Sequence, residues 1–262
     1  MKYNYFNKFT FLLLFVYSVA SLSGGVQYCS VEYSSINHIG DLCDFLLFSV
    51  VPMASLKRLS KAERQQITLP ENLKEILVGL LLADLYACKQ AVNVHLQFGQ
   101  GIIHKDYLYH LYKLFQTYCL NAPKIQNNLP DRRTGKVYSV LKFQTRAFPC
   151  FNELYHLFYP SGKKIVPLNI AELLTPLALA YWLSDDGSFI KSHGTIILST
   201  DGFSLEEVKL LASVLNNKWD FNCTINKSGD GFRIRIPKKS VPKVQALLKN
   251  IMPPMMLHKI GL

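Results

Sequence analysis

One pattern occurs twice in this chain: a short apolar stretch that ends on an aspartate. The first copy covers residues 77–84 and ends at Asp84, and the second covers residues 179–186 and ends at Asp186. Apolar residues without intervening charge predict a buried helix, and an acid at its C-terminal end opposes the helix dipole. Two matched helices of this unusual kind indicate an internal duplication, with two similar halves related by a pseudo-two-fold axis.

Small residues predict that these two helices touch. They stand four positions apart in both stretches: Gly79 with Ala83, and Ala180 with Ser184. Such pairs let helix backbones approach closely, so we expect the two helices to pack side by side at the centre of the molecule. Their ends would then bring Asp84 and Asp186 together, where the two carboxylates repel each other unless a cation is present.

The two acids therefore predict a divalent metal site. Carboxylates, free backbone carbonyls near Ala83 and Asp185, and substrate phosphate suit Mg²⁺, a hard cation that keeps several waters. Taken alone, Asp84 would be a solvated helix-end acid, and residues 185–187 an acidic turn capped by Gly187. Their matched positions favour the metal site. The scattered cysteines and histidines have no zinc-ligand spacing, so we set zinc aside.

The elements between the two helices also recur in order. For the first half we expect a helix over 71–84, a strand over 92–98, a helix over 104–118, a hairpin turning near 131–135 and a helix over 150–158. For the second half we expect a helix over 173–186, a strand over 194–200, a helix over 204–219, a hairpin through 227–231 and a helix over 241–251. These patterns predict an α+β fold with two αββαββα repeats, over residues 65–167 and 168–262.

Each predicted sheet has one polar face. In the first half Val137, Leu141 and Phe143 alternate with Lys136, Lys142, Gln144 and Arg146, and the strand at 92–98 alternates apolar even positions with polar odd ones. In the second half Arg233 and Arg235 lie opposite Phe232, Ile234 and Ile236. These charges could belong to a merely solvated face. Two basic faces and a net charge of +11 favour a polyanion-binding surface instead.

Residues 1–60 differ from the rest of the chain, and we treat them as a separate leader. Lys2 and Lys8 precede an apolar run over residues 9–20, which has the form of a secretory signal peptide and is too short for a confident membrane span. A second apolar stretch covers residues 44–52. The hypothesis of a membrane-tethered or secreted protein depends on this leader alone. If the gene is organellar, the leader is instead upstream exon sequence or a mis-called start.

Over residues 65–262 the chain resembles the LAGLIDADG homing endonucleases, in the single-chain, two-repeat form encoded by organellar introns. The resemblance is carried by residues 174–187, 149–155, 162–165 and 254–259. It implies two saddle-shaped antiparallel sheets along the DNA major groove, with the motif helices at the centre. It also implies a mitochondrial, monomeric enzyme that uses Mg²⁺ or Mn²⁺ to hydrolyse one phosphodiester bond in each strand of a long target.

The resemblance also assigns roles to single residues. The eighth motif position supplies the metal-binding acid, which selects Asp84 and Asp186 over Asp185, and Lys164 and Lys259 fall where the family has basic residues around the scissile phosphates. Either lysine could instead be a simple phosphate anchor. The candidate DNA contacts are Asn93, His95, Gln97, Arg132, Arg133, Lys136, Lys142, Gln144, Arg146, Lys191, His193, Lys227, Arg233 and Arg235.

Two residues depart from the family pattern. Leu85 replaces the glycine after the first acid, so we expect that helix to end without a left-handed cap, at a cost of about 1 kcal/mol. Tyr181 replaces a glycine within the second motif, so Ala180 and Ser184 should carry the close helix approach on that side.

Two functional hypotheses follow from the resemblance. The first is a site-specific DNA endonuclease that promotes the mobility of its host intron. The second is an RNA-binding maturase that assists splicing of that intron, since proteins resembling this family do either or both. Retention of both acids favours cleavage, because splicing assistance does not require them. We expect no stable membrane partner for the body of the chain.

Overall fold

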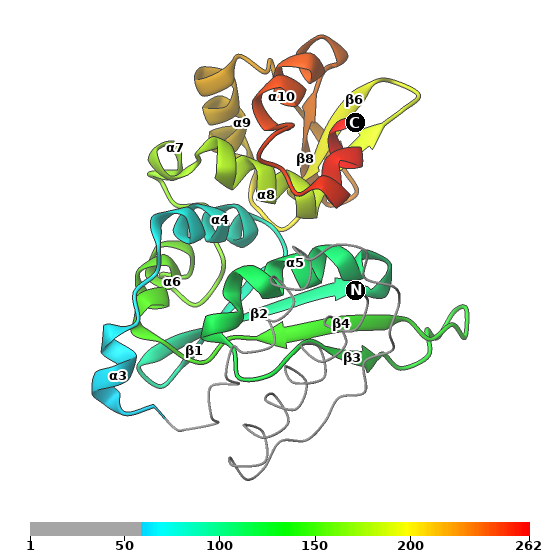
Figure 1. The fold of residues 1–262 in the computed structure, drawn as a ribbon. Helices are drawn as coiled ribbons and strands as arrows, with labels where there is room; N and C mark the ends of the chain where they lie inside the picture. The colour runs from blue at the N-terminus through cyan, green and yellow to red at the C-terminus, as the bar shows by residue number, and fades with distance from the viewer. Residues whose placement is uncertain (1–58) are drawn as a thin grey trace, which may run out of the picture. The chain divides into compact units, whose positions relative to one another are not determined.

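The computed structural model describes residues 59–262, and in them each half of the duplication forms a four-stranded antiparallel sheet with helices packed on it (Figure 1). The leader predicted for residues 1–60 lies outside the described residues, except for its last two positions. The two halves together form one compact unit. Among the residues that the structure describes, no helix is both long enough and apolar enough to cross a membrane.

The first half follows the predicted order of elements. It contains α3 (Lys61–Gln66), α4 (Glu71–Leu82), β1 (Tyr86–Gln90), β2 (Asn93–Gly101), η1 (Ile102–His104), α5 (Lys105–Phe115), η2 (Gln116–Tyr118), β3 (Lys124–Asn127), β4 (Ser139–Gln144), η3 (Pro149–Phe151) and α6 (Asn152–Phe158). The strand order in its sheet is β1-β2-β4-β3. Helix α5 packs on one face of this sheet, against β2 and β4.

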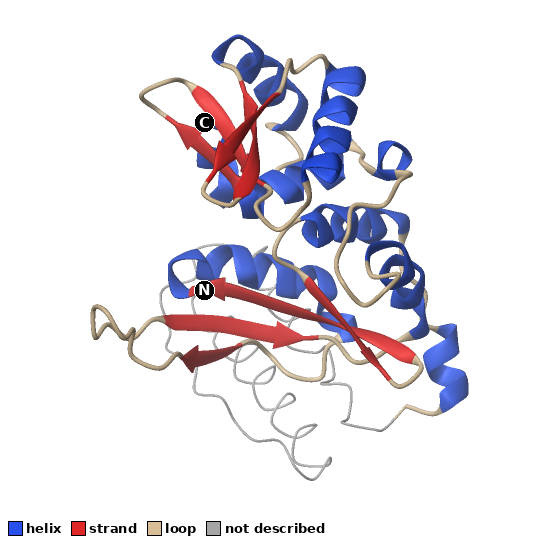
Figure 2. Cartoon of the chain, turned by 180° about the vertical axis from the view of Figure 1, so that it is seen from behind, coloured by secondary structure: helices blue, strands red, loops and turns tan. Residues whose placement is uncertain are grey.

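The second half repeats this arrangement. It contains α7 (Ile170–Leu173), α8 (Pro176–Asp186), β5 (Gly187–Ile190), β6 (Thr195–Ser199), α9 (Leu205–Trp219), β7 (Thr224–Ser228), β8 (Gly231–Ile236), η4 (Lys238–Ser240), α10 (Val241–Leu248) and η5 (Pro254–Ile260). Its strand order, β5-β6-β8-β7, matches that of the first sheet, and α9 packs on it as α5 does on the first (Figure 2). The predicted α+β fold with two αββαββα repeats is confirmed.

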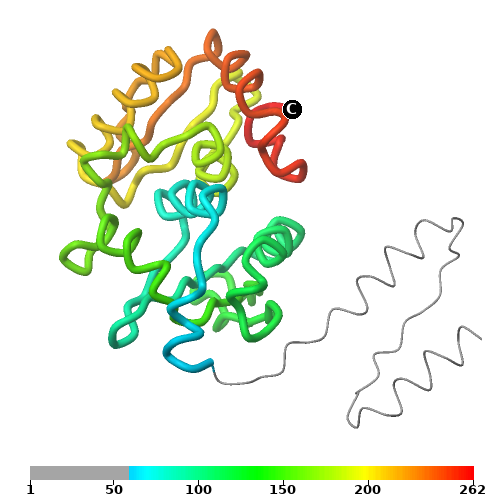
Figure 3. Tube along the Cα trace, turned by 60° about the vertical axis from the view of Figure 1, so that its left-hand side comes forward, coloured from blue at the N-terminus to red at the C-terminus, as the bar shows by residue number. Residues whose placement is uncertain are grey.

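Helices α4 and α8 pack against each other where the two halves meet (Figure 3). Residues 76–82 of α4 and 178–184 of α8 are all buried. This explains their uniformly apolar sequences, because a helix surrounded by protein on all sides needs no polar face. The prediction that the motif helices lie together at the centre is confirmed.

The ends of these helices differ from the predicted bounds. Helix α4 ends at Leu82, so Asp84 lies beyond its last turn. The second predicted helix, 173–186, is divided, because Pro176 cannot continue a preceding helix and instead starts α8, with Thr175 as its N-cap. The expected penalty for Leu85 is wrong. Neither Leu85 nor Gly187 has a positive φ, so this position needs no left-handed cap.

Two apolar residues do not take the core positions predicted for them. Val92 precedes β2 and is 77% exposed, and Val137 precedes β4 and is 54% exposed. The alternation itself is correct, since Val94, Leu96 and Phe98 of β2 are buried. The sequence pattern did not predict the bounds of β1 and β5, the strands that follow the two acids. These strands are short and bury few side chains, so they show no clear alternation of apolar and polar residues.

Candidate active site

A glycine brings the backbones of the two motif helices into contact. A Cβ atom at Gly79 of α4 would lie 2.0 Å from the carbonyl oxygen of Ala178 and 3.1 Å from the backbone nitrogen of Trp182, both in α8. The residues facing Gly79 are therefore not the predicted pair of Ala180 and Ser184. The Ser184 hydroxyl instead donates to the Ala180 carbonyl within its own helix, at 2.8 Å.

The close approach brings the two predicted acids to one place. Asp84 and Asp186 line the same cavity, which has a volume of about 400 Å³. The cavity wall is completed by Lys163, Lys164 and residues 199–203, which comprise the last residue of β6 and the loop after it. The carboxylate of Asp186 is largely buried, and burial together with the negative charge of Asp84 raises its pKa to about 7, against the opposing effect of Lys164 and Lys259. The two carboxylates therefore interact electrostatically.

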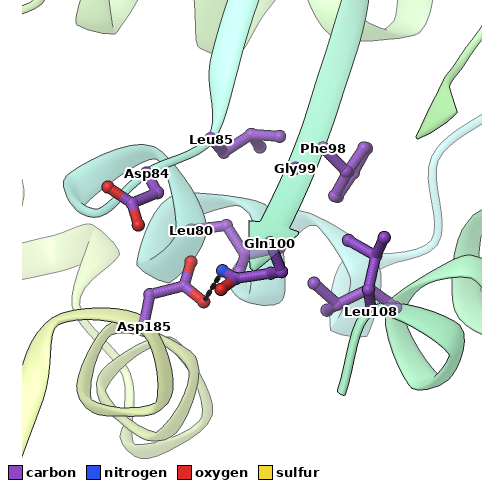
Figure 4. Close-up of a pocket in the computed structure, with 9 residues that line it drawn as sticks. Leu80, Asp84, Leu85, Phe98, Gly99, Gln100, Leu108 and Asp185 are labelled. Atoms are coloured by element: carbon purple, nitrogen blue, oxygen red, sulfur yellow. Dashed lines mark hydrogen bonds between the residues drawn. The ribbon is translucent and has the colours of Figure 1, made fainter. Parts of the chain in front are cut away.

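The neighbouring acid, Asp185, points to a different group. Its Oδ1 accepts a hydrogen bond from Nε2 of Gln100, at the end of β2, over 3.1 Å (Figure 4). Burial and the charges of Asp84 and Asp186 hold the pKa of Asp185 well above its ordinary range. Gln100 was missed in the sequence. Its position is even, like those of the core residues Leu96 and Phe98, so its side chain lies on the core face of β2. A polar residue at a core-facing position of a strand could have indicated its role.

The two predicted lysines bind the carbonyl oxygens at the ends of the motif helices. Nζ of Lys164 donates to the carbonyls of Ala83 and Leu85, at 2.7 and 2.8 Å, and Nζ of Lys259 donates to the carbonyl of Asp185 at 3.4 Å. Burial lowers the pKa of Lys164 to about 8, although the nearby acids oppose this effect. The carbonyls that we expected to be free are thus already hydrogen-bonded.

The residues at this place fit a hard divalent cation. Two carboxylates border one cavity, and the charge of Asp84 makes ionisation of Asp186 less favourable, an effect that a cation would offset. In residues 59–262 no cluster of three or more His, Cys, Asp or Glu side chains has metal-binding geometry. A site with two protein carboxylates leaves positions for water and phosphate oxygens, which is the arrangement Mg²⁺ commonly adopts beside phosphates.

Strand register places many of the candidate DNA contacts of the first half on one sheet face. His95 pairs with Cys88, Gln97 with Gln144, and Gly99 with Lys142. Residues on this shared face are Asn93, His95, Gln97, Lys142 and Gln144. Arg132, Arg133 and Lys136 lie in the turn between β3 and β4, and Arg146 follows β4, with its guanidinium 5.9 Å from the centre of the Phe148 ring.

The second sheet divides its predicted contacts between two faces. Arg233 pairs with Ser199, and Arg235 with Ile197, so the two arginines share the polar face as predicted. Lys227 pairs with Phe232, on the face of the buried Ile234, so it lies opposite the arginines. Lys191 and His193 lie in the turn between β5 and β6.

Comparisons with known proteins agree with this architecture. Residues 74–244 match the LAGLIDADG DNA endonuclease family. A cytochrome b mRNA maturase bI2 from Debaryomyces hansenii is 34% identical over 74% of this chain and 75% of its own length. A probable intron-encoded endonuclease 1 from Wickerhamomyces canadensis is 29% identical over 78% of this chain and 90% of its own length.

A solved structure shares the fold across both halves. It is the homing endonuclease I-WcaI bound to its DNA recognition sequence, with a TM-score of 0.72 and 28% identity, covering 79% of this chain and 96% of that chain. The match includes both repeats rather than one, since it extends over nearly all of the described residues. By sequence and by fold, this chain belongs to the LAGLIDADG DNA endonuclease family, in its two-repeat form.

Proposed function

We propose that this protein is a site-specific DNA endonuclease that cuts both strands of a long target and so promotes the mobility of its host intron. The observation that carries the proposal is the meeting of Asp84 and Asp186, from two duplicated motifs, in one cavity beside Lys164. An acid pair at the ends of two closely packed helices is costly for folding, because like charges and both helix dipoles repel. Its presence favours a functional role over a structural one.

In this proposal each group of the site has a defined role. The carboxylates of Asp84 and Asp186 would hold the metal, with the second lone pairs of the Ala83 and Asp185 carbonyls as further ligands. Bound Mg²⁺ or Mn²⁺ would supply an activated water and stabilise the leaving oxygen. Lys164 and Lys259 would offset negative charge that develops on the phosphates. Gln100 fixes the side chain of Asp185 and keeps it away from this role.

The polar faces of the two sheets are the proposed DNA-binding surface. Lys142 and Gln144 of the first sheet and Arg233 and Arg235 of the second present hydrogen-bond donors of the kinds that read base edges or bind phosphates. Both halves come from a single chain, so a monomer can supply both cutting sites. The DNA-bound structure of I-WcaI supports this use of the fold.

A second function is favoured by one of the relatives. The protein from Debaryomyces hansenii at 34% identity is named a cytochrome b mRNA maturase, so assistance in splicing of the host intron RNA is the alternative activity. The same name supports a mitochondrial location for the gene and its product. Assistance in splicing would use the basic surface to bind RNA and would not require the two acids.

The test is cleavage of the intron-free host gene across the intron insertion site, with Mg²⁺ and with Ca²⁺. We expect double-strand cutting with Mg²⁺ only. Asp84→Asn and Asp186→Asn should each abolish cutting or reduce it to nicking. Glu172→Gln is the matched control, because it removes an exposed acid of α7 that does not line the cavity, and it should cut normally. A folded protein that never cuts and binds intron RNA would instead establish the maturase.

A further inference from the structure

Two basic residues of the second sheet differ in their surroundings, although they lie on the same face. Nε of Arg233 donates to both carboxylate oxygens of Asp201, at 3.1 and 3.0 Å, and its Nη2 lies 3.0 Å from Oδ2. The side chain of Arg235, two residues further along β8, has no hydrogen bond or ion pair within residues 59–262, although its backbone pairs with both neighbouring strands. Only the first arginine is therefore held in one orientation.

The chain is arranged to allow this ion pair. Asp201 follows β6 and crosses over the start of β8, where a Cβ atom at Gly231 would lie 2.8 Å from the Asp201 Cα. Only a glycine lets the two segments approach so closely. The pair stays accessible, since the side chains of Arg233 and Asp201 are 42% and 39% exposed. Asp201 is therefore placed to orient the arginine at the surface rather than to bury it.

The contacts leave one edge of the guanidinium available. A guanidinium has five N–H groups in a planar fork, and Asp201 occupies Nε and one side of Nη2. Within the part of the chain that the structure describes, the edge formed by Nη1 and Nη2 has no partner, and its two parallel donors match the O6 and N7 acceptors of guanine in the major groove. Because the carboxylate neutralises the positive charge, the pair attracts a phosphate less than a free arginine does.

Among the described residues, the first sheet has no ion pair at the position equivalent to Arg233 and Asp201. Lys142 pairs with Gly99 as Arg233 pairs with Ser199, so the two basic residues occupy equivalent positions. In the first half Gly101 stands where the second half has Asp201. Lys142 therefore lacks the acid that Arg233 has at this position and forms no ion pair with residues 59–262, which suits a phosphate contact rather than the planar recognition of one base.

We infer that Arg233, oriented by Asp201, reads a guanine in the DNA target. Ser199, its neighbour in register, and Asp201 both line the cavity that holds Asp84 and Asp186. The guanine should therefore lie close to the cut in the half-site bound by the second sheet, rather than at its outer end. The inference rests on the proposed function, since it assumes that the polar sheet faces bind DNA.

The test measures binding without cleavage, because Asp201 also lines the cavity of the acids. Fluorescence anisotropy in EDTA would use the full chain and duplexes spanning the intron insertion site, with single base-pair substitutions. The wild-type protein should lose about tenfold to a hundredfold in affinity when one guanine near the cut is replaced by adenine. Replacing it by 7-deazaguanine, which lacks the N7 acceptor, should also weaken binding.

The variants separate orientation from charge. Arg233→Ala should remove the discrimination at that position and leave it intact elsewhere. Asp201→Asn should reduce the preference for guanine while strengthening binding to unrelated DNA. Arg235→Ala is the matched control and should weaken binding to all sequences alike, with a shallower salt dependence. Circular dichroism and thermal unfolding would verify that each variant is folded.

Three outcomes would overturn the inference. Base reading would be contradicted if no guanine in the target required Arg233 for its recognition. A uniform gain in affinity for Asp201→Asn, with unchanged discrimination, would make Arg233 a phosphate contact held back by the acid. Failure of the wild-type protein to bind any duplex from this region would contradict the proposed function itself, and the inference with it.

Discussion

Gly79 shows how a single residue positions the two acids. No side chain separates α4 from α8 at this point, and a methyl group would lie 2.0 Å from the Ala178 carbonyl oxygen. Backbone atoms cannot yield to such a contact as the end of a flexible side chain can. Helix separation at Gly79 therefore controls how closely Asp84 and Asp186 approach each other.

We accordingly predict that Gly79→Ala destabilises the protein by about 3 kcal/mol, because the overpacked helices must move apart. Denaturant unfolding followed by circular dichroism would measure the change. Gly202→Ala is the control, since a Cβ there meets nothing within 4 Å. That variant should change the free energy of unfolding by no more than about 0.5 kcal/mol. Similar losses in both variants would contradict the proposed helix contact.

At the scale of elements, α5 of the first half is linked to the motif helix of the second. The His110 Nε2 lies 2.8 Å from the Tyr181 hydroxyl of α8, and the imidazole ring stacks with those of Tyr107 and Tyr181. Tyr181 stands where the family motif has a glycine, and its hydroxyl thus has a polar partner, His110, in the other half of the molecule. Burial, and then the positive charge of Lys113, lower the pKa of His110.

This link predicts a pH dependence of stability. The folded state binds a proton at His110 less readily than the unfolded state does, so protonation favours unfolding. The contribution of His110 to the free energy of unfolding is fully present above its ordinary pKa near 6.5. This contribution is lost as the pH falls through the lowered pKa of the folded state. Thermal unfolding from pH 7.5 to pH 5 should show a smaller loss of stability for His110→Gln than for the wild-type protein. Parallel curves for the two proteins would contradict this role.

For the whole molecule, net charge and the two polar faces determine how the protein responds to salt. The chain carries a net charge of +11. Each phosphate that a basic side chain neutralises releases counterions, so binding to DNA should weaken steeply as salt increases. The turn between β3 and β4 carries three of these side chains, Arg132, Arg133 and Lys136.

We predict that replacing these three residues by alanine reduces the slope of log Kobs against log salt by about 3 and leaves site preference unchanged. The matched control replaces Lys209, Lys239 and Lys249, which are exposed on α9, η4 and the end of α10. It removes the same charge from helical elements outside the strand faces. Equal changes in slope for both variants would show that binding follows net charge rather than the sheet surface.

Local sequence patterns determined the duplication, the order of elements, the apolar motif helices and the two acids at their ends. These features depend on periodicity and on neighbours a few residues away, which a single sequence contains. The same reasoning assigned Arg233 and Arg235 to one face of a strand. The face on which Lys227 lies could not be predicted, because the register of β7 against β8 decides it and the hairpin pattern alone did not reveal that register. Its contact with DNA stays a prediction.

Only the tertiary structure decided which distant groups meet. Gln100 and Asp185 are 85 positions apart in the chain, and Lys164 and Ala83 are 81 apart, yet each pair forms a hydrogen bond. Arg233 and Asp201 likewise meet across 32 positions. Such partners depend on how the sheets and helices pack, and no local periodicity records that packing. The sequence by itself determined the kinds of groups available, and packing determined their partners.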